Sequence, residues 1–284
     1  MSTTIFKISA FGDEIAADLQ TQLDTLNELG VGFLELRAVG GTNVLHLDDE
    51  QVRAVERACA EAGVAVSCIG SPVGKSPLLA PPEDERANLL RLIEIADVLH
   101  TRLIRVFSFY PPDATTNELY DEYVSQAVER LVDLSHLAEQ EGVVLVLENE
   151  KAIIGDTPER CWRILRGVDS PALRFAWDPA NFIQVGVDVP ISAGWHLLAP
   201  YVEHVHVKDA VSGSGQVCPA GEGDGQVPEL LTALSRDDYR GFIALEPHLA
   251  VAGHSSGFSG VEGMTRAVVA LRDVLSSLGY EEDR

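Results

Sequence analysis

Short apolar runs rich in β-branched residues recur along the whole chain, and each is followed by a stretch with apolar residues at helical spacing. Leu19, Leu23, Leu26 and Leu29 are one such helical set. The apolar runs predict strands at residues 6–9, 32–36, 65–69, 103–106, 143–148, 173–177, 202–207 and 242–245. Because parallel strands need a crossover connection, alternating strands and helices predict a parallel sheet.

Helix start and stop signals fall where this alternation requires them. Asp48 with Gln51 three residues later fits a capping box, and Thr157 precedes a proline at the first helical position. Glycines stand at three predicted helix ends, namely Gly30, Gly63 and Gly142. These signals support the element boundaries that the hydrophobic pattern predicts.

The number of predicted strands favours a sheet that closes into a barrel. Eight strands suit a (β/α)₈ TIM barrel, while an open doubly wound sheet is the alternative. No glycine-rich dinucleotide loop follows the first strand, which speaks against the open sheet. The sixth crossover is the weakest, because residues 181–200 offer only 192–198 as a short helix. No linker divides the sequence, so we predict a single (β/α)₈-barrel domain over residues 1–284.

Composition and net charge indicate which partners the protein binds and in which cell compartment it works. The formal net charge is −23, and a surface that negative repels nucleic-acid phosphates and anionic lipid. No run of about 18 apolar residues predicts a membrane span, and no basic-then-apolar N-terminal segment predicts a signal peptide. Four separated cysteines are typical of reduced thiols. We therefore expect a cytoplasmic protein that binds neither nucleic acid nor membrane; a homo-oligomer is compatible with the sequence.

Candidate metal ligands follow four successive predicted strands. Glu148 and Glu150 end the fifth, Asp178 follows the sixth, the seventh carries histidines, and Glu246 follows the eighth. In a parallel α/β barrel these strand ends form the active-site face. Carboxylates converging there without a cation would repel one another, and three carboxylates with one imidazole suit Mn²⁺, Mg²⁺, Co²⁺ or Zn²⁺. We predict one divalent metal ion at the barrel mouth.

Strand alternation narrows the ligand set without completing it. Glu148 and Glu150 share one face of their strand, and Asn149 points the other way. His204, His206 and Lys208 likewise share a face. Spacing alone therefore leaves open the choice between the two glutamates and between the two histidines.

The segments LVLENE, FAWDPANF, EHVHVKDA and FIALEPHL resemble those of the sugar isomerase and epimerase superfamily with a xylose isomerase-like barrel. This group includes ketose 3-epimerases, hydroxypyruvate isomerase and inosose dehydratase. The resemblance implies metal ligands at Glu148, Asp178, His206 and Glu246, with Mn²⁺ as the expected ion. It runs from Asp13 to the EPHL segment.

Two positions depart from the pattern of that superfamily. Glu150 and Asn181 stand where relatives often carry histidine. Both changes alter the shell that would face a substrate, so no particular substrate is implied. The residues predicted to contact substrate are Glu35, Arg37, Lys75, Glu150, Asn181, Lys208 and His248.

The implied activity is isomerisation or epimerisation of a small sugar or sugar derivative through an enediolate, with Glu148 and Glu246 as the catalytic acid–base pair. A metal-dependent dehydratase or lyase acting on a keto-sugar or keto-inositol is the alternative. Type IV AP endonucleases share this barrel, but they need more histidine ligands and a basic groove. A non-catalytic sugar binder completes the set of hypotheses.

Overall fold

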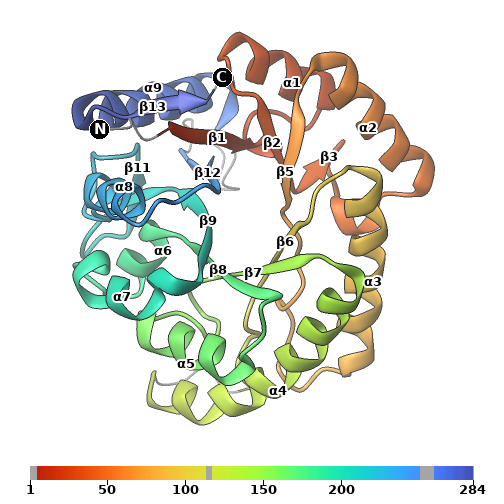
Figure 1. The fold of residues 1–284 in the computed structure, drawn as a ribbon, viewed down its shortest axis with the longest axis vertical. Helices are drawn as coiled ribbons and strands as arrows, with labels where there is room; N and C mark the ends of the chain where they lie inside the picture. Colours follow the sequence, from red (N-terminus) through yellow and green to blue (C-terminus); the bar gives the residue numbers. More distant parts are fainter. Residues whose placement is uncertain (1–4, 113–116, 250–258, 284) are drawn as a thin grey trace.

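A computed structural model of the chain describes residues 5–112, 117–249 and 259–283. Eight parallel strands form a ring in which each pairs with its neighbours, and the last strand pairs with the first (Figure 1). The strands of the ring are β1 (Ile5–Phe11), β2 (Phe33–Leu36), β5 (Ala65–Ile69), β6 (Leu103–Val106), β7 (Val144–Glu148), β8 (Leu173–Trp177), β9 (Val202–Val207) and β12 (Phe242–Leu245). The fold is a (β/α)₈ barrel of the TIM type, as the alternation predicts.

Helices surround the ring on its outer side (Figure 1). They are α1 (Leu19–Glu28), α2 (Asp49–Ala62), α3 (Pro82–Val98), α4 (Asn117–Glu141), α5 (Pro158–Val168), α6 (Pro179–Gln184), α7 (Pro190–Leu198), α8 (Val227–Arg236) and α9 (Gly260–Leu278). The predicted capping box at Asp48 and Gln51 is present, and the Thr157 side chain caps α5. Gly63 ends α2 with a φ of 69°, a conformation that costs glycine little.

The predicted strands agree with the observed ones closely. Five have the expected bounds, while β1, β2 and β7 differ by one or two residues at an end. The prediction for the sixth crossover was wrong. The connection holds two helices, α6 and α7, and α7 begins two residues earlier than expected. Asp178 caps α6 by accepting a hydrogen bond from the Asn181 backbone, and Pro179 occupies the first helical position. Too short to show periodicity, α6 depends on this cap.

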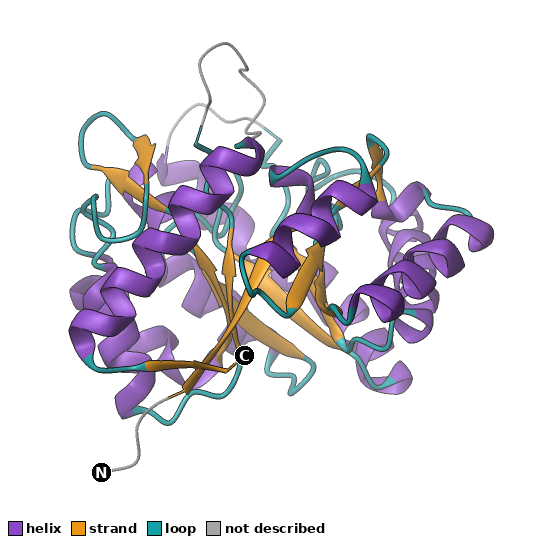
Figure 2. Ribbon diagram, turned by 90° about the horizontal axis from the view of Figure 1, so that it is seen from above, coloured by secondary structure: helices purple, strands orange, loops and turns teal. Residues whose placement is uncertain are grey.

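Smaller elements decorate the barrel. Two hairpins, β3–β4 (Ala38–Val39 and Thr42–Asn43) and β10–β11 (Asp209–Val211 and Gln216–Cys218), follow barrel strands β2 and β9. Both project at the upper end in Figure 2, where the barrel strands end. At the opposite end, β13 (Glu281–Asp283) pairs with the start of β1. The hairpins therefore mark the C-terminal mouth of the barrel.

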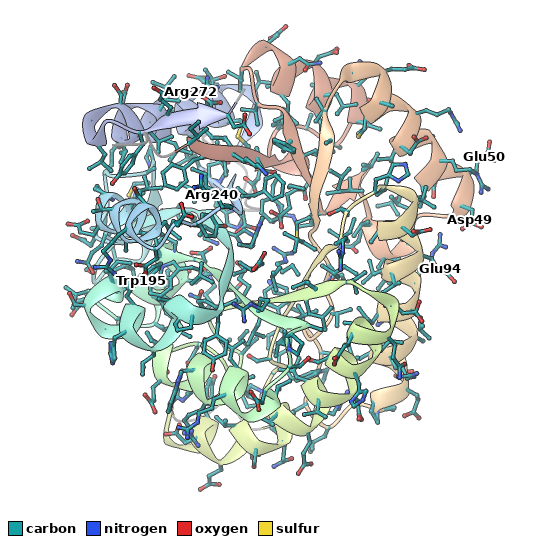
Figure 3. The ribbon with its side chains drawn as sticks, in the orientation of Figure 1. Asp49, Glu50, Glu94, Trp195, Arg240 and Arg272 are labelled. Carbon is teal, nitrogen blue, oxygen red and sulfur yellow. The ribbon has the colours of Figure 1, made fainter. Side chains whose placement is uncertain are left out.

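Period-two alternation divides each strand between two environments. Outward residues such as Phe175, Trp177 and Val205 pack in the main hydrophobic core with the helices. Inside the ring, Cys68 and Val146 belong to a small separate apolar cluster. Side chains fill this interior (Figure 3). The apolar cluster thus lies below the charged residues that end the strands.

Several acidic side chains on the outer helices point to solvent. Asp49, Glu50 and Glu94 lie on the outer side of α2 and α3 (Figure 3), where Arg91 bridges Asp49 and Glu94 at 2.8 and 3.0 Å. Within the described residues, no helix combines the length and apolarity that crossing a membrane requires. Residues 1–4, part of the segment on which the signal-peptide expectation rests, lie outside the described residues.

Candidate metal centre

Four side chains from successive barrel strands converge at the mouth. Glu148 is the last residue of β7, Asp178 follows β8, His206 lies on β9, and Glu246 follows β12. Each offers one ligand atom, and these atoms all lie within 4.8 Å of one another. All four side chains are buried. The structure brings together the four residues that the sequence singles out as ligands.

The Glu148 carboxylate lies among three polar neighbours. Arg105 NH1 is 3.2 Å from Glu148 Oε2, His206 Nδ1 is 3.0 Å from Oε1, and Asn181 Nδ2 donates to Oε1 at 3.3 Å. Burial disfavours the charged form, but His206 and Arg105 outweigh it and lower the pKa of Glu148 to about 2. The carboxylate is therefore ionised, as a metal ligand or a base requires.

Asp178 uses its two carboxylate oxygens differently. Oδ1 caps α6, while Oδ2 lies 2.8 Å from Lys208 Nζ. The Asn149 side chain accepts from the Asp178 backbone N–H at 2.9 Å and donates to its carbonyl at 2.8 Å, which fixes the backbone here. Burial raises the pKa of Asp178 to about 6 against the attraction of Lys208, and Glu148 and Glu246 add to the rise. A further positive charge would relieve this excess of negative charge.

His206 presents its two ring nitrogens to different partners. Nδ1 faces Glu148 and the other candidate ligands, whereas Nε2 lies 3.2 Å from Glu35 Oε1. The second oxygen of Glu35 lies 2.7 Å from His204 Nε2. Metal-binding histidines commonly give their second nitrogen to a carboxylate in this way, which fixes the tautomer. Glu35 and His204 thus lie behind His206.

Glu246 is surrounded by cations. Arg37 NH1 donates to its Oε1 at 2.6 Å and Lys208 Nζ donates to its Oε2 at 2.9 Å. Arg105 NH1 is 3.8 Å from Oε1. Despite the opposing effect of burial, Lys208 and the neighbouring cations hold the pKa of Glu246 well below its usual range.

The donor set fits a divalent cation. Glu148 Oε2, Asp178 Oδ2 and His206 Nδ1 are buried without a hydrogen bond of good geometry, although each lies near a group of opposite charge. Buried carboxylate oxygens without such a bond are costly unless positive charge lies beside them, and a divalent ion would add to it. Three carboxylates and one imidazole could hold one divalent metal ion. Because several divalent ions accept these donors, the identity of the ion stays open.

Six of the seven residues predicted to contact substrate fall into two groups. Arg37, Lys75, Glu150 and His248 lie at the rim, where Lys75 Nζ pairs with Glu150 Oε2 at 3.0 Å. Lys208 and Asn181 lie deeper, against the candidate ligands.

Glu35, the remaining residue predicted to contact substrate, lies apart from both groups. It is fully buried, and both of its oxygens contact histidines. The alternation of β2 turns Glu35 towards the barrel interior, where His206 lies between it and Glu148.

Arg105 is the main residue that the sequence reasoning missed. It lies inside the barrel on β6, is 4% exposed, and contacts both Glu148 and Glu246. Its guanidinium also lies over the rings of Phe11 and Phe107. A charge within an otherwise apolar buried strand was the available signal, because arginine is rarely buried unless paired.

The chain belongs to the xylose isomerase-like TIM barrel family, whose match covers residues 23–265. It is 31% identical over 185 residues to the 2-epi-5-epi-valiolone 7-phosphate 2-epimerase of Actinoplanes sp.. That match covers 65% of this chain and 64% of the relative, so the chain spans less than two thirds of its length.

Solved structures show the same architecture. D-psicose 3-epimerase with D-tagatose, from Clostridium cellulolyticum H10, superposes with a TM-score of 0.73 at 18% identity over 96% of this chain and 99% of that one. An IolI protein with a bound zinc atom superposes with a TM-score of 0.76 at 16% identity, over 96% and 99% of the two chains. At these identities the likeness establishes the fold.

Proposed function

We propose that the chain is a divalent-metal-dependent isomerase or epimerase of a sugar or sugar derivative, acting by proton transfer through an enediolate. The observation that carries this proposal is the convergence of Glu148 and Glu246 with Asp178 and His206 in one buried cluster. The Actinoplanes relative is named as a 2-epimerase, which also favours proton transfer over other reactions of the fold.

Glu148, Asp178, His206 and Glu246 would hold the ion. When bound, a divalent ion would polarise a substrate carbonyl and the neighbouring hydroxyl, which acidifies the C–H between them. Glu148 and Glu246 come from β7 and β12, which are separated by two strands in the ring. They can therefore approach a substrate from different sides, so one removes a proton and the other returns it.

The cations between these carboxylates would stabilise the reaction. Lys208 lies beside Glu246, and Arg105 is near both carboxylates, so each can stabilise negative charge developing on a substrate oxygen. Burial strengthens these interactions because little water screens them. Glu35 would act through His206 by holding its Nε2 and turning Nδ1 towards the ion.

The proposal is tested by metal analysis of the purified protein together with deuterium exchange into ketoses in heavy water. We expect a bound divalent ion and exchange of a carbon-bound hydrogen that is lost on chelation and restored by Mn²⁺. Absence of metal binding after an ion is added back would contradict the ligand assignment.

Dehydration of a keto-sugar or keto-inositol is the second candidate, because it would begin with the same proton removal. His248 favours it: this side chain is 31% exposed, and its Nε2 lies 3.8 Å from Glu246 Oε1, where it could protonate a departing hydroxyl. Product mass separates the two reactions, since isomerisation leaves it unchanged and dehydration lowers it by one water.

A further inference from the structure

Every one of four cations at the barrel mouth is paired with a carboxylate of the chain. Lys75 pairs with Glu150, and Arg105 with Glu148. The other two cations each contact several acids: Arg37 contacts Asp13, Glu14 and Glu246, and Lys208 contacts Asp178 and Glu246. An anionic substrate would therefore meet each of them beside a carboxylate that already contacts it.

These pairs leave no surplus of positive charge. The four cations contact six carboxylates, so these groups together are negative, and a divalent ion would at most offset their excess. A phosphate group carries nearly two negative charges at neutral pH. Its arrival would return the mouth to a net negative charge in a poorly solvated space, where like charges repel strongly.

In the described loop after β9, the backbone donors that often bind phosphate in this fold are also taken. TIM barrels frequently bind phosphate with the loops after their last two strands. Here the glycine-rich loop after β9 wraps the chain's own Asp209, which is fully buried. The Asp209 carboxylate accepts hydrogen bonds from four backbone N–H groups at 2.8–3.1 Å, those of Ala210, Gly221, Gly223 and Gly225. The loop forms an anion nest that an internal carboxylate already fills.

A further lysine near the mouth, Lys151, is not part of the ion pairs described above. Lys151 follows β7 and is exposed, and its Nζ donates to the Gln184 side chain at 3.3 Å. Residues 113–116 and 250–258, which lie outside the described residues, contain no lysine or arginine. The contribution of Lys151 therefore needs a direct test.

We propose that this site takes uncharged polyhydroxy ketones, either open-chain or cyclic, and discriminates against their phosphate esters. The inference rests on the proposed function and specifies its substrate class. Its physical basis is that an ester would either break a buried ion pair and leave a carboxylate unpaired, or place its charge beside carboxylates.

The test measures deuterium exchange in heavy water by the metal-loaded protein with matched pairs of compounds. The pairs are ketohexoses and a keto-inositol, each with its own phosphate ester. For a pair that reacts, we expect exchange from the uncharged member to exceed that from its ester by about 100-fold in kcat/KM, as expected for unfavourable like-charge contacts. Equal or faster exchange from the ester overturns the inference and supports the proposed function. No exchange from any compound removes the proposed function and this inference with it.

A variant that frees Lys75 from its ion pair tests whether this pairing causes the discrimination against esters. Glu150→Gln leaves Lys75 without its carboxylate, so the ratio of ester to free compound should rise by about tenfold. Adding Lys75→Met to that variant should restore the original ratio. Glu203→Gln removes the same charge at the other end of the barrel, and Lys151→Met removes the nearby lysine that donates to Gln184; neither should change the ratio. An unchanged ratio in Glu150→Gln contradicts the role assigned to the ion pair.

Discussion

The two ends of the barrel interior are built from the same strands but satisfy their polar groups in different ways. At the N-terminal end, a cavity of about 640 Å³ is lined partly by Ser67, Thr101 and Tyr239. The Thr101 hydroxyl donates to the Ser67 carbonyl at 2.9 Å, and the Tyr239 hydroxyl to the Phe242 carbonyl at 2.7 Å. At the C-terminal mouth, buried charged side chains contact one another instead.

The difference indicates which end of the barrel can support catalysis. Neutral hydroxyls that donate to backbone carbonyls stabilise the strands, but they supply no charged group for acid–base chemistry. Charged pairs at the N-terminal end, such as Arg240 with Asp238, are exposed and contribute little (Figure 3). The mouth concentrates buried ion pairs, which cost desolvation energy that packing alone would not require. Such a cluster is expected where function demands it.

The largest effect should come from removing one carboxylate at the mouth. Glu246→Gln should lower deuterium exchange by about 10²–10⁴-fold, since it removes one proton-transfer group. Metal content measured alongside separates a lost acid–base group from a lost ligand. Glu203→Gln at the other end is the control and should exchange normally. Full activity in Glu246→Gln contradicts its catalytic assignment.

Lowering the pH should weaken metal binding at the mouth. Against the effect of burial, Glu148 and Glu35 raise the pKa of His206 to about 10, so the ion must displace a proton from Nδ1. Affinity should fall about tenfold for each unit of pH below that value, and more steeply below the Asp178 pKa of about 6. Calorimetry in buffers of different ionisation heat measures the released protons. A metal affinity that does not vary with pH would contradict the predicted loss of affinity at low pH.

A positioning residue behind the ligands should have a smaller effect. Glu35→Gln should weaken metal binding about 10–100-fold, because the amide holds the His206 Nε2–H less strongly than the carboxylate does. Thr101→Val is the matched change at the N-terminal end and should leave affinity unaltered. Wild-type affinity in a folded Glu35→Gln protein means that His206 needs no such support.

The smallest effect is expected at the N-terminal end itself. Tyr239→Phe removes the hydroxyl that donates to the Phe242 carbonyl, so the free energy of unfolding should fall by about 1 kcal/mol. Exchange activity should be unchanged. Urea denaturation measures the first quantity and the heavy-water assay the second. A loss of activity without a loss of stability would show that this end also serves function.

The barrel could be predicted because its information is local. Each strand is a run of apolar residues, and helix caps such as Asp48 and Thr157 act within four residues of themselves. The missing α6 shows the limit, because its six residues are too few for a period and depend on one cap. Candidate ligands were also accessible, since parallel strands in a barrel deliver their last residues to the same end.

What the sequence determined by itself was therefore the order of strands and helices and the set of residues at the strand ends. Only the tertiary structure decided their partners: Arg105 between Glu148 and Glu246, Glu35 behind His206, and Asp209 inside its glycine loop. The physical reason is the difference in sequence separation between the residues that interact. Secondary structure follows from spacing along the chain, whereas burial and pairing of charge depend on residues more than 100 positions apart, such as Glu35 and His206, meeting in space.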